Sequence, residues 1–232
     1  YQSELNIKEG DLLRALLIHT PHTEKKNRLF LTIHHLAIDG ISWRVLLEDL
    51  EVLLSKEAIE SSTILPAKGT SYRQWTEKLQ EYAVLPSTQL EYSYWKEVLS
   101  KYRPLPVDFS SDIETTYEQT HTIQTRLSRA DTASLTQEIH HAYGTEINDI
   151  LLSALSKTME GWISSSEFVI GLEGHGREEL FRDVDLSRTI GWFTSLYPVC
   201  LSVPSSGTVS YEDLISRTKD SLREIPKKGI NY

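Results

Sequence analysis

The sequence has few of the features that mark secreted, membrane or nucleic-acid-binding proteins. Its 232 residues include one cysteine, Cys200, so no disulfide bond can form within the chain, as expected in a reducing compartment. No apolar run approaches the ~18 residues of a membrane-spanning helix, and no signal peptide is evident. Acidic residues outnumber basic ones by 33 to 24, which argues against a nucleic-acid partner. These absences predict a cytoplasmic protein that binds neither membranes nor nucleic acids.

Hydrophobic residues, 39% of the sequence, are enough for one large domain or two smaller lobes. The spacing of the apolar residues predicts a mixture of helices and strands along the whole chain, and therefore the α/β class with two-layer α+β lobes. We expect Ser87 and Ser210 to cap two of the helices. The predicted strands cover residues 12–20, 28–35 (joined to the first by a hairpin loop at 21–27), 120–127, 168–173 and 191–203; the predicted helices cover residues 41–54, 71–82, 87–102, 130–143, 146–162 and 210–224.

The sequence HHLAIDG at residues 34–40 contains the side chains best suited to chemistry. Neighbouring side chains of a strand point to opposite faces, so His34 and His35 cannot both ligate one metal or reach one substrate. From these residues alone, a structural histidine pair and a catalytic histidine both remain open. Asp39 has a structural interpretation as well, as a helix cap or ion-pair partner that stabilises the turn at Gly40.

A second candidate region begins at Glu173, which ends an apolar strand. Gly174 and Gly176 follow it and permit close approach of the backbone to a ligand. Glu173 is suited to act as a catalytic carboxylate, but also to form a structural ion pair with Arg177. Neither a His-Glu-x-x-His nor a Cys-x-x-Cys pattern occurs, so we expect no metal site.

Several ordered motifs resemble those of the condensation superfamily of non-ribosomal peptide synthetases. The HHxxxDG pattern of residues 34–40 is similar to the signature of that superfamily and of its acetyltransferase relatives. Five further stretches resemble epimerization domains rather than condensation domains: residues 40–44 (GISWR), 148–154 (NDILLSA), 173–178 (EGHGRE), 188–198 (RTIGWFTSLYP) and 225–232 (IPKKGINY). The chain thus resembles the central part of an epimerization domain, with the family's first and last motifs outside residues 1–232.

The resemblance implies a chloramphenicol-acetyltransferase-like fold, in which two lobes form a V around a tunnel. We expect a partial N-terminal lobe over residues 1–108, which contains the HHxxxDG motif, and a partial C-terminal lobe over residues 109–232, which contains the EGHGRE motif. Residues 103–108 include two prolines and no helical periodicity, so the chain is expected to cross between the lobes there. The fold would be incomplete at both termini.

The resemblance also implies an activity, epimerization of the α-carbon of an aminoacyl or peptidyl thioester held on a carrier protein. His35 from one lobe and Glu173 from the other would act as acid and base, with Glu173 buried because burial favours a protonated carboxyl. The supporting residues would be His34, Asp39, Gly40 and Arg177, and the residues expected to line the tunnel are Trp192, Phe193 and Tyr232. For Trp192 and Phe193, core packing remains an alternative.

No cofactor of its own is implied for the chain, because the phosphopantetheine arm belongs to the carrier protein. That carrier protein, or thiolation domain, is expected in the same polypeptide. Two other functions remain open: a condensation domain that forms amide bonds, and an inactive fragment that docks carrier proteins. The amino acid or peptide that would be epimerized is not indicated by any residue of the sequence.

Overall fold

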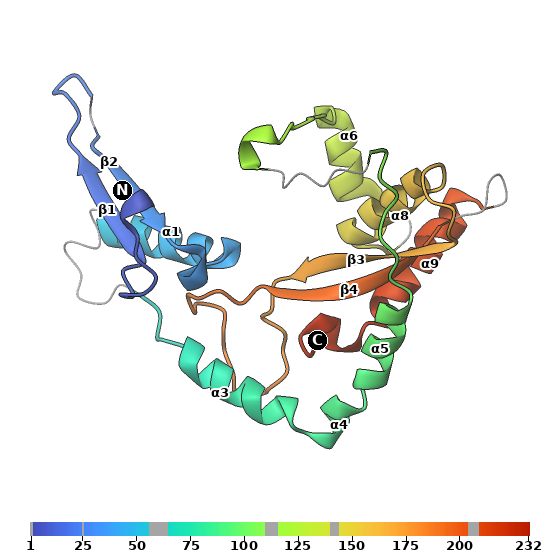
Figure 1. Ribbon diagram of the computed structural model, residues 1–232. Helices are drawn as coiled ribbons and strands as arrows, with labels where there is room; N and C mark the ends of the chain where they lie inside the picture. Colours follow the sequence, from blue (N-terminus) through green and yellow to red (C-terminus); the bar gives the residue numbers. More distant parts are fainter. Residues whose placement is uncertain (1, 25, 56–64, 110–115, 140–143, 204–208) are drawn as a thin grey trace. The chain divides into compact units, whose positions relative to one another are not determined.

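The computed structural model describes residues 2–24, 26–55, 65–109, 116–139, 144–203 and 209–232 (Figure 1). The chain groups into two compact units, the first formed by Tyr1–Gln89 with Glu173–Ser195 and the second by Leu90–Leu172 with Leu196–Tyr232. This grouping differs from the expected boundary at residue 108, because residues 90–108 belong to the second unit and residues 173–195 to the first. The assignment of lobes stays a prediction.

The first unit begins with the predicted hairpin. β1 (Leu13–Ile18) and β2 (Arg28–Ile33) are antiparallel, with Leu13 opposite Ile33 and Ile18 opposite Arg28. β2 ends at Ile33, two residues earlier than predicted, and a 3₁₀ turn, η2 (His35–Ala37), follows. The imidazole Nδ1 of His34 accepts a hydrogen bond from the backbone N–H of Leu36 (3.1 Å) and so caps this turn. His34 and His35 therefore do not alternate across a strand as predicted, because neither lies in β2.

Two capped helices of the first unit confirm the sequence analysis. α1 (Gly40–Leu54) begins at Asp39, whose side chain accepts from the N–H of Ser42. α3 (Tyr72–Ala83) begins at Ser71, which forms a reciprocal capping box with Gln74. In each case a polar side chain satisfies a free N–H of the first helical turn.

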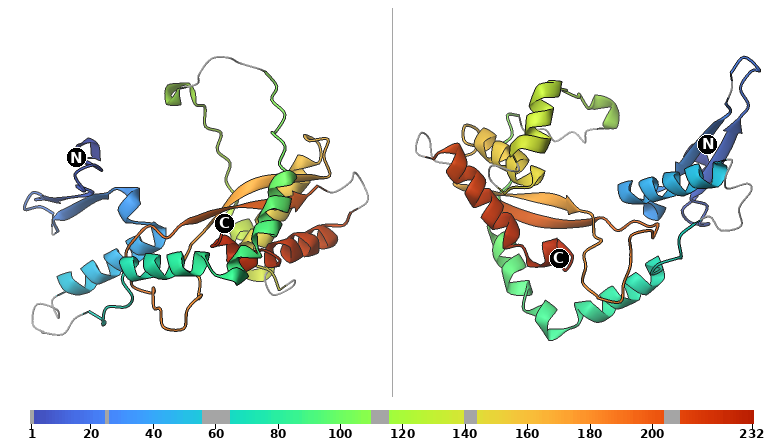
Figure 2. Two further views of the ribbon diagram at one scale, coloured as in Figure 1. Left: turned by 60° about the horizontal axis from the view of Figure 1, so that its bottom comes forward. Right: turned by 180° about the vertical axis from the view of Figure 1, so that it is seen from behind.

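Residues 175–194 form a long loop that leaves β3, runs along α3 and returns to β4 (Figure 2). Several contacts attach this loop to α3 and the residues before it. The Phe181 ring meets Trp75 edge-on at 5.7 Å, Thr70 N donates to Asp185 O (2.8 Å), and Lys78 pairs with Asp183 (2.7 Å). These contacts explain why a segment from late in the sequence belongs to the first unit.

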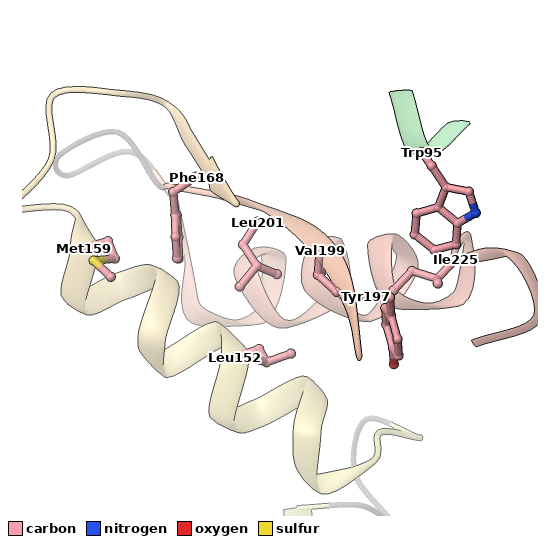
Figure 3. Close-up of a cluster of buried hydrophobic side chains, with 8 residues drawn as sticks. All are labelled: Trp95, Leu152, Met159, Phe168, Tyr197, Val199, Leu201 and Ile225. Atoms are coloured by element: carbon pink, nitrogen blue, oxygen red, sulfur yellow. The ribbon is translucent and has the colours of Figure 1, made fainter. Parts of the chain in front are cut away.

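The second unit is built on β3 (Glu167–Gly174) and β4 (Ser195–Ser202), which are hydrogen-bonded neighbours. Its helices include α5 (Tyr92–Ser100), α8 (Ile147–Met159) and α9 (Tyr211–Arg223), the last with its predicted cap at Ser210. Figure 3 shows side chains of α8 pointing toward those of the two strands. The buried cluster consists of Trp95, Leu152, Met159, Phe168, Tyr197, Val199, Leu201 and Ile225.

Two predicted elements of the second unit were wrong. Residues 120–127 are exposed and irregular instead of forming a strand. Among the described residues the sheets contain β1 with β2 and β3 with β4, so the backbone there has no neighbouring strand to pair with, whatever its β-propensity. The helix predicted over 87–102 is divided into α4 (Pro86–Gln89) and α5, and Ser87 lies inside α4 instead of capping it.

The remaining elements are short. α6 (Arg129–Ala133) continues into the π-helical turn η4 (Ser134–Glu138), while residues 140–143 of the predicted helix lie outside the described residues. The strand predicted over 191–203 begins only at Ser195. In the described part of the chain, no helix has the length and apolar character to cross a membrane. The other short helices are η1 (Gln2–Glu4), η3 (Tyr117–Gln119) and η5 (Pro226–Gly229).

Candidate functional site

The HHxxxDG motif and the EGHGRE motif meet inside the first unit, at the carboxylate of Asp39. Asp39 is 4% exposed, and its Oδ1 accepts a hydrogen bond from Ser42 N at 2.7 Å. Its Oδ2 accepts from the backbone N–H of Phe193 at 3.1 Å, and Arg177 Nη2 lies 3.3 Å from Oδ1. Burial raises the pKa of Asp39, but the hydrogen bonds from Ser42 and Phe193 and the charge of Arg177 outweigh burial. The pKa of this carboxyl therefore lies below its usual range, and Asp39 is ionised at neutral pH.

The guanidinium of Arg177 donates hydrogen bonds to four residues of the first unit. Its Nη2 donates to Asp39 and to the hydroxyl of Ser42 (2.8 Å). Its Nη1 donates to the carbonyl oxygens of Leu186 and Thr189, both at 2.8 Å. The side chain is only 8% exposed, and its Cζ atom lies 3.8 Å from the centroid of the Phe193 ring. The guanidinium thus links the start of α1 to the loop of residues 175–194.

Ser42 is the third member of this group, which we call the Arg177 network (Asp39, Ser42 and Arg177). The Ser42 side chain is fully buried, and its hydroxyl donates to Gly191 O (2.9 Å). The same hydroxyl accepts from Gly191 N (3.1 Å) as well as from Arg177. Ser42 lies in the GISWR stretch of residues 40–44, but no role was predicted for it. A small polar residue in the first turn of a helix, three residues after an N-cap aspartate, was the only signal available.

The glycine at 176 is required by the geometry of the EGHGRE motif. Its φ of +64° is unfavourable for other residues, and a Cβ there would lie 1.6 Å from Phe193 O. On either side of it, His175 Nδ1 accepts from Arg177 N at 3.0 Å, and His175 Nε2 lies 3.3 Å from Glu178. His175 therefore stabilises the loop.

His35 and Trp192 lie side by side on this unit. Their ring centroids are 5.5 Å apart, with an angle of 49° between the planes. His35 is exposed, whereas His34 is half-buried and caps the turn through its Nδ1. Trp192 is 41% exposed and Phe193 only 5%. Phe193 packs against Tyr72 (5.0 Å between centroids) and Arg177, so it occupies the core position that was the alternative to a tunnel-lining role.

The other predicted site residues, Glu173, Gly40 and Tyr232, lie outside the Arg177 network. Glu173 belongs to the same compact unit as His35 and is exposed, so the expected burial is not found. The ion pair considered between Glu173 and Arg177 is replaced by the pair of Arg177 with Asp39. Gly40 is the first residue of α1, and a Cβ there would contact nothing within 4 Å. Tyr232 belongs to the second unit, where its ring lies 5.2 Å from that of Trp95.

The described residues contain no group of three or more His, Cys, Asp or Glu side chains arranged to hold a metal ion. Cys200 lies 3.6 Å from Glu167, and burial, followed by the charge of Glu167, raises the pKa of its thiol to about 11. A thiol with this pKa is protonated at neutral pH and is a poor nucleophile. Cys200 is therefore a structural residue in β4.

The fold of this chain matches that of a protein whose structure has been solved. The crystal structure of the epimerization domain from the third module of tyrocidine synthetase B matches it with a TM-score of 0.86 and 38% sequence identity. The match covers 99% of this chain and 52% of that chain. Residues 1–232 also match the family described as Condensation domain. The chain therefore belongs to the condensation-domain family.

The sequence relatives are parts of much longer proteins. Two subunits of linear gramicidin synthase from Brevibacillus parabrevis are 38% and 42% identical to this chain, over 231 and 232 residues respectively. Tyrocidine synthase 1 of the same organism is 39% identical over 233 residues. The alignments cover 99% or 100% of this chain, but the chain spans only 4% and 3% of the two gramicidin synthase subunits and 21% of tyrocidine synthase 1.

Proposed function

We propose that this chain is part of an epimerization domain of a non-ribosomal peptide synthetase. Its activity would be to invert the α-carbon of an aminoacyl or peptidyl thioester held on the phosphopantetheine arm of a carrier protein. The observation that carries the proposal is the match to an epimerization domain at 38% identity and a TM-score of 0.86. The EGHGRE sequence of residues 173–178 and the RTIGWFTSLYP sequence of residues 188–198 support the same choice.

The proposed reaction moves one proton off the α-carbon and returns another to its opposite face. A base removes the α-proton, the electron pair passes into the thioester carbonyl as an enolate, and an acid protonates the carbon from the other side. The carbon is thereby inverted without any change in oxidation state. His35 and Glu173 are the proposed acid and base. A histidine exchanges protons near neutral pH, and a carboxylate can accept the proton in one direction and return it in the other.

Three features of the first unit support this assignment. His35 and Glu173 are both exposed, and therefore accessible to a ligand. Asp39 and Arg177 both belong to the Arg177 network, and Glu178 is half-buried, which leaves His35, Glu173 and His175 as the exposed acid–base residues of the two motifs. His175 Nδ1 caps the loop and His175 Nε2 lies next to Glu178.

The test uses the full-length protein that contains this chain, with a carrier protein loaded with an L-aminoacyl thioester in deuterated water. We expect incorporation of deuterium at the α-carbon and appearance of the D-amino acid after release, measured by mass spectrometry and chiral chromatography. His35→Ala and Glu173→Gln should each lower the exchange rate by roughly 10²–10⁴-fold. The matched controls, His121→Ala and Glu179→Gln, replace exposed residues of the same types and should leave the rate unchanged.

Two other outcomes would contradict the proposal. Amide product formed from donor and acceptor thioesters, with no α-proton exchange, would make this a condensation domain. Binding of the carrier protein with neither reaction would make it a docking fragment. Exchange that survives both His35→Ala and Glu173→Gln would reject the two proposed acid–base residues but not the reaction itself.

A further inference from the structure

We propose that Trp192 is a positioning residue for His35, and that packing of its indole against the imidazole sets the orientation of the ring for proton transfer. The inference rests on the proposed function, because it assigns a partner to the proposed acid–base histidine. The ring centroids lie 5.5 Å apart with the planes inclined at 49°. This separation is within the range of favourable aromatic packing.

The need for such a partner follows from the surroundings of His35. A histidine that transfers protons is usually oriented by a hydrogen bond from its second ring nitrogen to a carboxylate or carbonyl. In the described part of the chain, no hydrogen bond reaches the imidazole of His35. The carboxylate of Asp39, four residues later, is already used by Ser42, Phe193 and Arg177. The contact with Trp192 therefore takes the place of the missing hydrogen bond.

The backbone of residues 191–193 is anchored by several hydrogen bonds to side chains, although the Trp192 side chain is exposed. Gly191 makes hydrogen bonds through both its N–H and its carbonyl to the Ser42 hydroxyl. Trp192 O accepts from the hydroxyl of Tyr72 at 2.8 Å. Phe193 N donates to Asp39 at 3.1 Å. Three successive residues are thus anchored by side chains at or near the starts of α1 and α3.

This arrangement couples Trp192 to His35 through one short stretch of chain. His35 begins the turn η2, and Asp39 and Ser42, which anchor residues 191–193, follow within seven residues. The imidazole and the indole are therefore attached to the same rigid start of α1. Gly191 contributes as well, because a Cβ there would lie 2.3 Å from the Tyr72 ring and would displace the tyrosine that holds Trp192.

Burial does not account for Trp192. Phe193 fills a core position between Tyr72 and Arg177, but the indole next to it remains 41% exposed. A large aromatic side chain kept at the surface by a fixed backbone is suited to present one face to a neighbouring ring. The exposed remainder of the indole would then form an apolar wall beside the substrate bound at His35.

The test is a double-mutant cycle in the full-length protein, with α-proton exchange of a carrier-bound aminoacyl thioester as the measurement. Trp192→Leu should lower kcat by roughly 10–100-fold with a smaller effect on KM, because a misplaced acid–base group slows the chemical step more than binding. Trp192→Phe keeps an aromatic face and should retain most of the activity. In a His35→Ala background, Trp192→Leu should have no further effect, because its role acts through His35.

The matched control is Trp162→Leu, which removes another half-exposed tryptophan, in the second unit, and should leave kcat unchanged. Equal losses from Trp192→Leu in the presence and absence of His35 would overturn the positioning role while leaving the proposed function intact. Full activity of Trp192→Leu would overturn it as well. No loss of exchange in His35→Ala would instead reject His35 as the acid–base residue, and the positioning role with it.

Discussion

Arg177 follows Asp39 by 138 residues, yet its Nη2 atom lies 3.3 Å from Asp39 Oδ1 inside the first compact unit. The pair is almost completely buried, with 8% of the Arg177 side chain and 5% of the Asp39 side chain exposed. A buried pair of this kind is costly to break, because the remaining charge loses both water and its partner. The HHxxxDG and EGHGRE motifs are thereby joined by a structural ion pair, and their catalytic candidates are the residues around it.

Replacement of Asp39 by Asn should destabilise the protein strongly. The substitution leaves the buried guanidinium of Arg177 without a counter-charge, for which we expect a loss of about 3–5 kcal/mol in the free energy of unfolding. Urea denaturation followed by tryptophan fluorescence measures this loss. The matched control is Glu77→Gln, which breaks the exposed pair of Glu77 with Arg73 and should cost less than about 1 kcal/mol. Equal effects of the two substitutions would contradict the assignment of Arg177 to a buried pair.

The contribution of Asp39 to stability should depend on pH in a defined direction. Because the folded pKa of Asp39 is lowered, the stabilisation is present above the unfolded pKa of about 3.9 and is lost as the pH falls through the folded value. The difference in unfolding free energy between the wild-type protein and Asp39→Asn should therefore be large at neutral pH and shrink below about pH 4. Other aspartates with lowered pKa values, such as Asp183, are present in both proteins and cancel in this difference. A difference that stays constant down to pH 3 would show that the charge of Asp39 is not responsible.

Gly176→Ala should be poorly tolerated. The new Cβ would lie 1.6 Å from Phe193 O, and the φ of +64° adds backbone strain. Strain and overpacking together should cost about 3 kcal/mol or more, measured as a lower melting temperature and denaturation midpoint. For comparison, Gly161→Ala introduces a Cβ with no atom within 4 Å and should change the stability by less than about 1 kcal/mol. If the Gly176→Ala protein were as stable as the Gly161→Ala protein, the close approach of residue 176 to the carbonyl oxygen of Phe193 would be contradicted.

Ser42→Ala tests whether the Arg177 network holds the loop that contains Trp192. The buried hydroxyl makes hydrogen bonds to Arg177 and to both backbone groups of Gly191, and its removal should cost about 1–3 kcal/mol in unfolding free energy. Because Gly191 loses both of its anchors, the rate of α-proton exchange should also fall. Ser100→Ala removes an exposed hydroxyl bonded to Glu97 O and should change stability by no more than about 0.5 kcal/mol. Unchanged stability and exchange in Ser42→Ala would separate this hydroxyl from both roles.

Local signals were sufficient for several elements of the fold. The predicted cap at Ser210 is present at the start of α9, and the helix predicted over 71–82 is α3, which begins after Ser71. The hairpin of β1 and β2 followed from two apolar runs around a polar loop. The strand predicted over 120–127 relied on propensity alone, and the single helix predicted over 87–102 relied on a cap at Ser87, which lies inside α4 instead. Propensity is a weak guide where no partner element or helix cap supports it.

The sequence by itself determined the family, through short motifs in a fixed order, and the local elements, through caps and periodicity that act within one or two turns. Only the tertiary structure decided that Arg177 pairs with Asp39 rather than with Glu173, that the Ser42 hydroxyl holds Gly191, and that Trp192 lies against His35. These contacts join residues more than a hundred positions apart. Their stability comes from burial and hydrogen bonding that exist only once the distant segments have met, so no local pattern of the sequence encodes which partners meet.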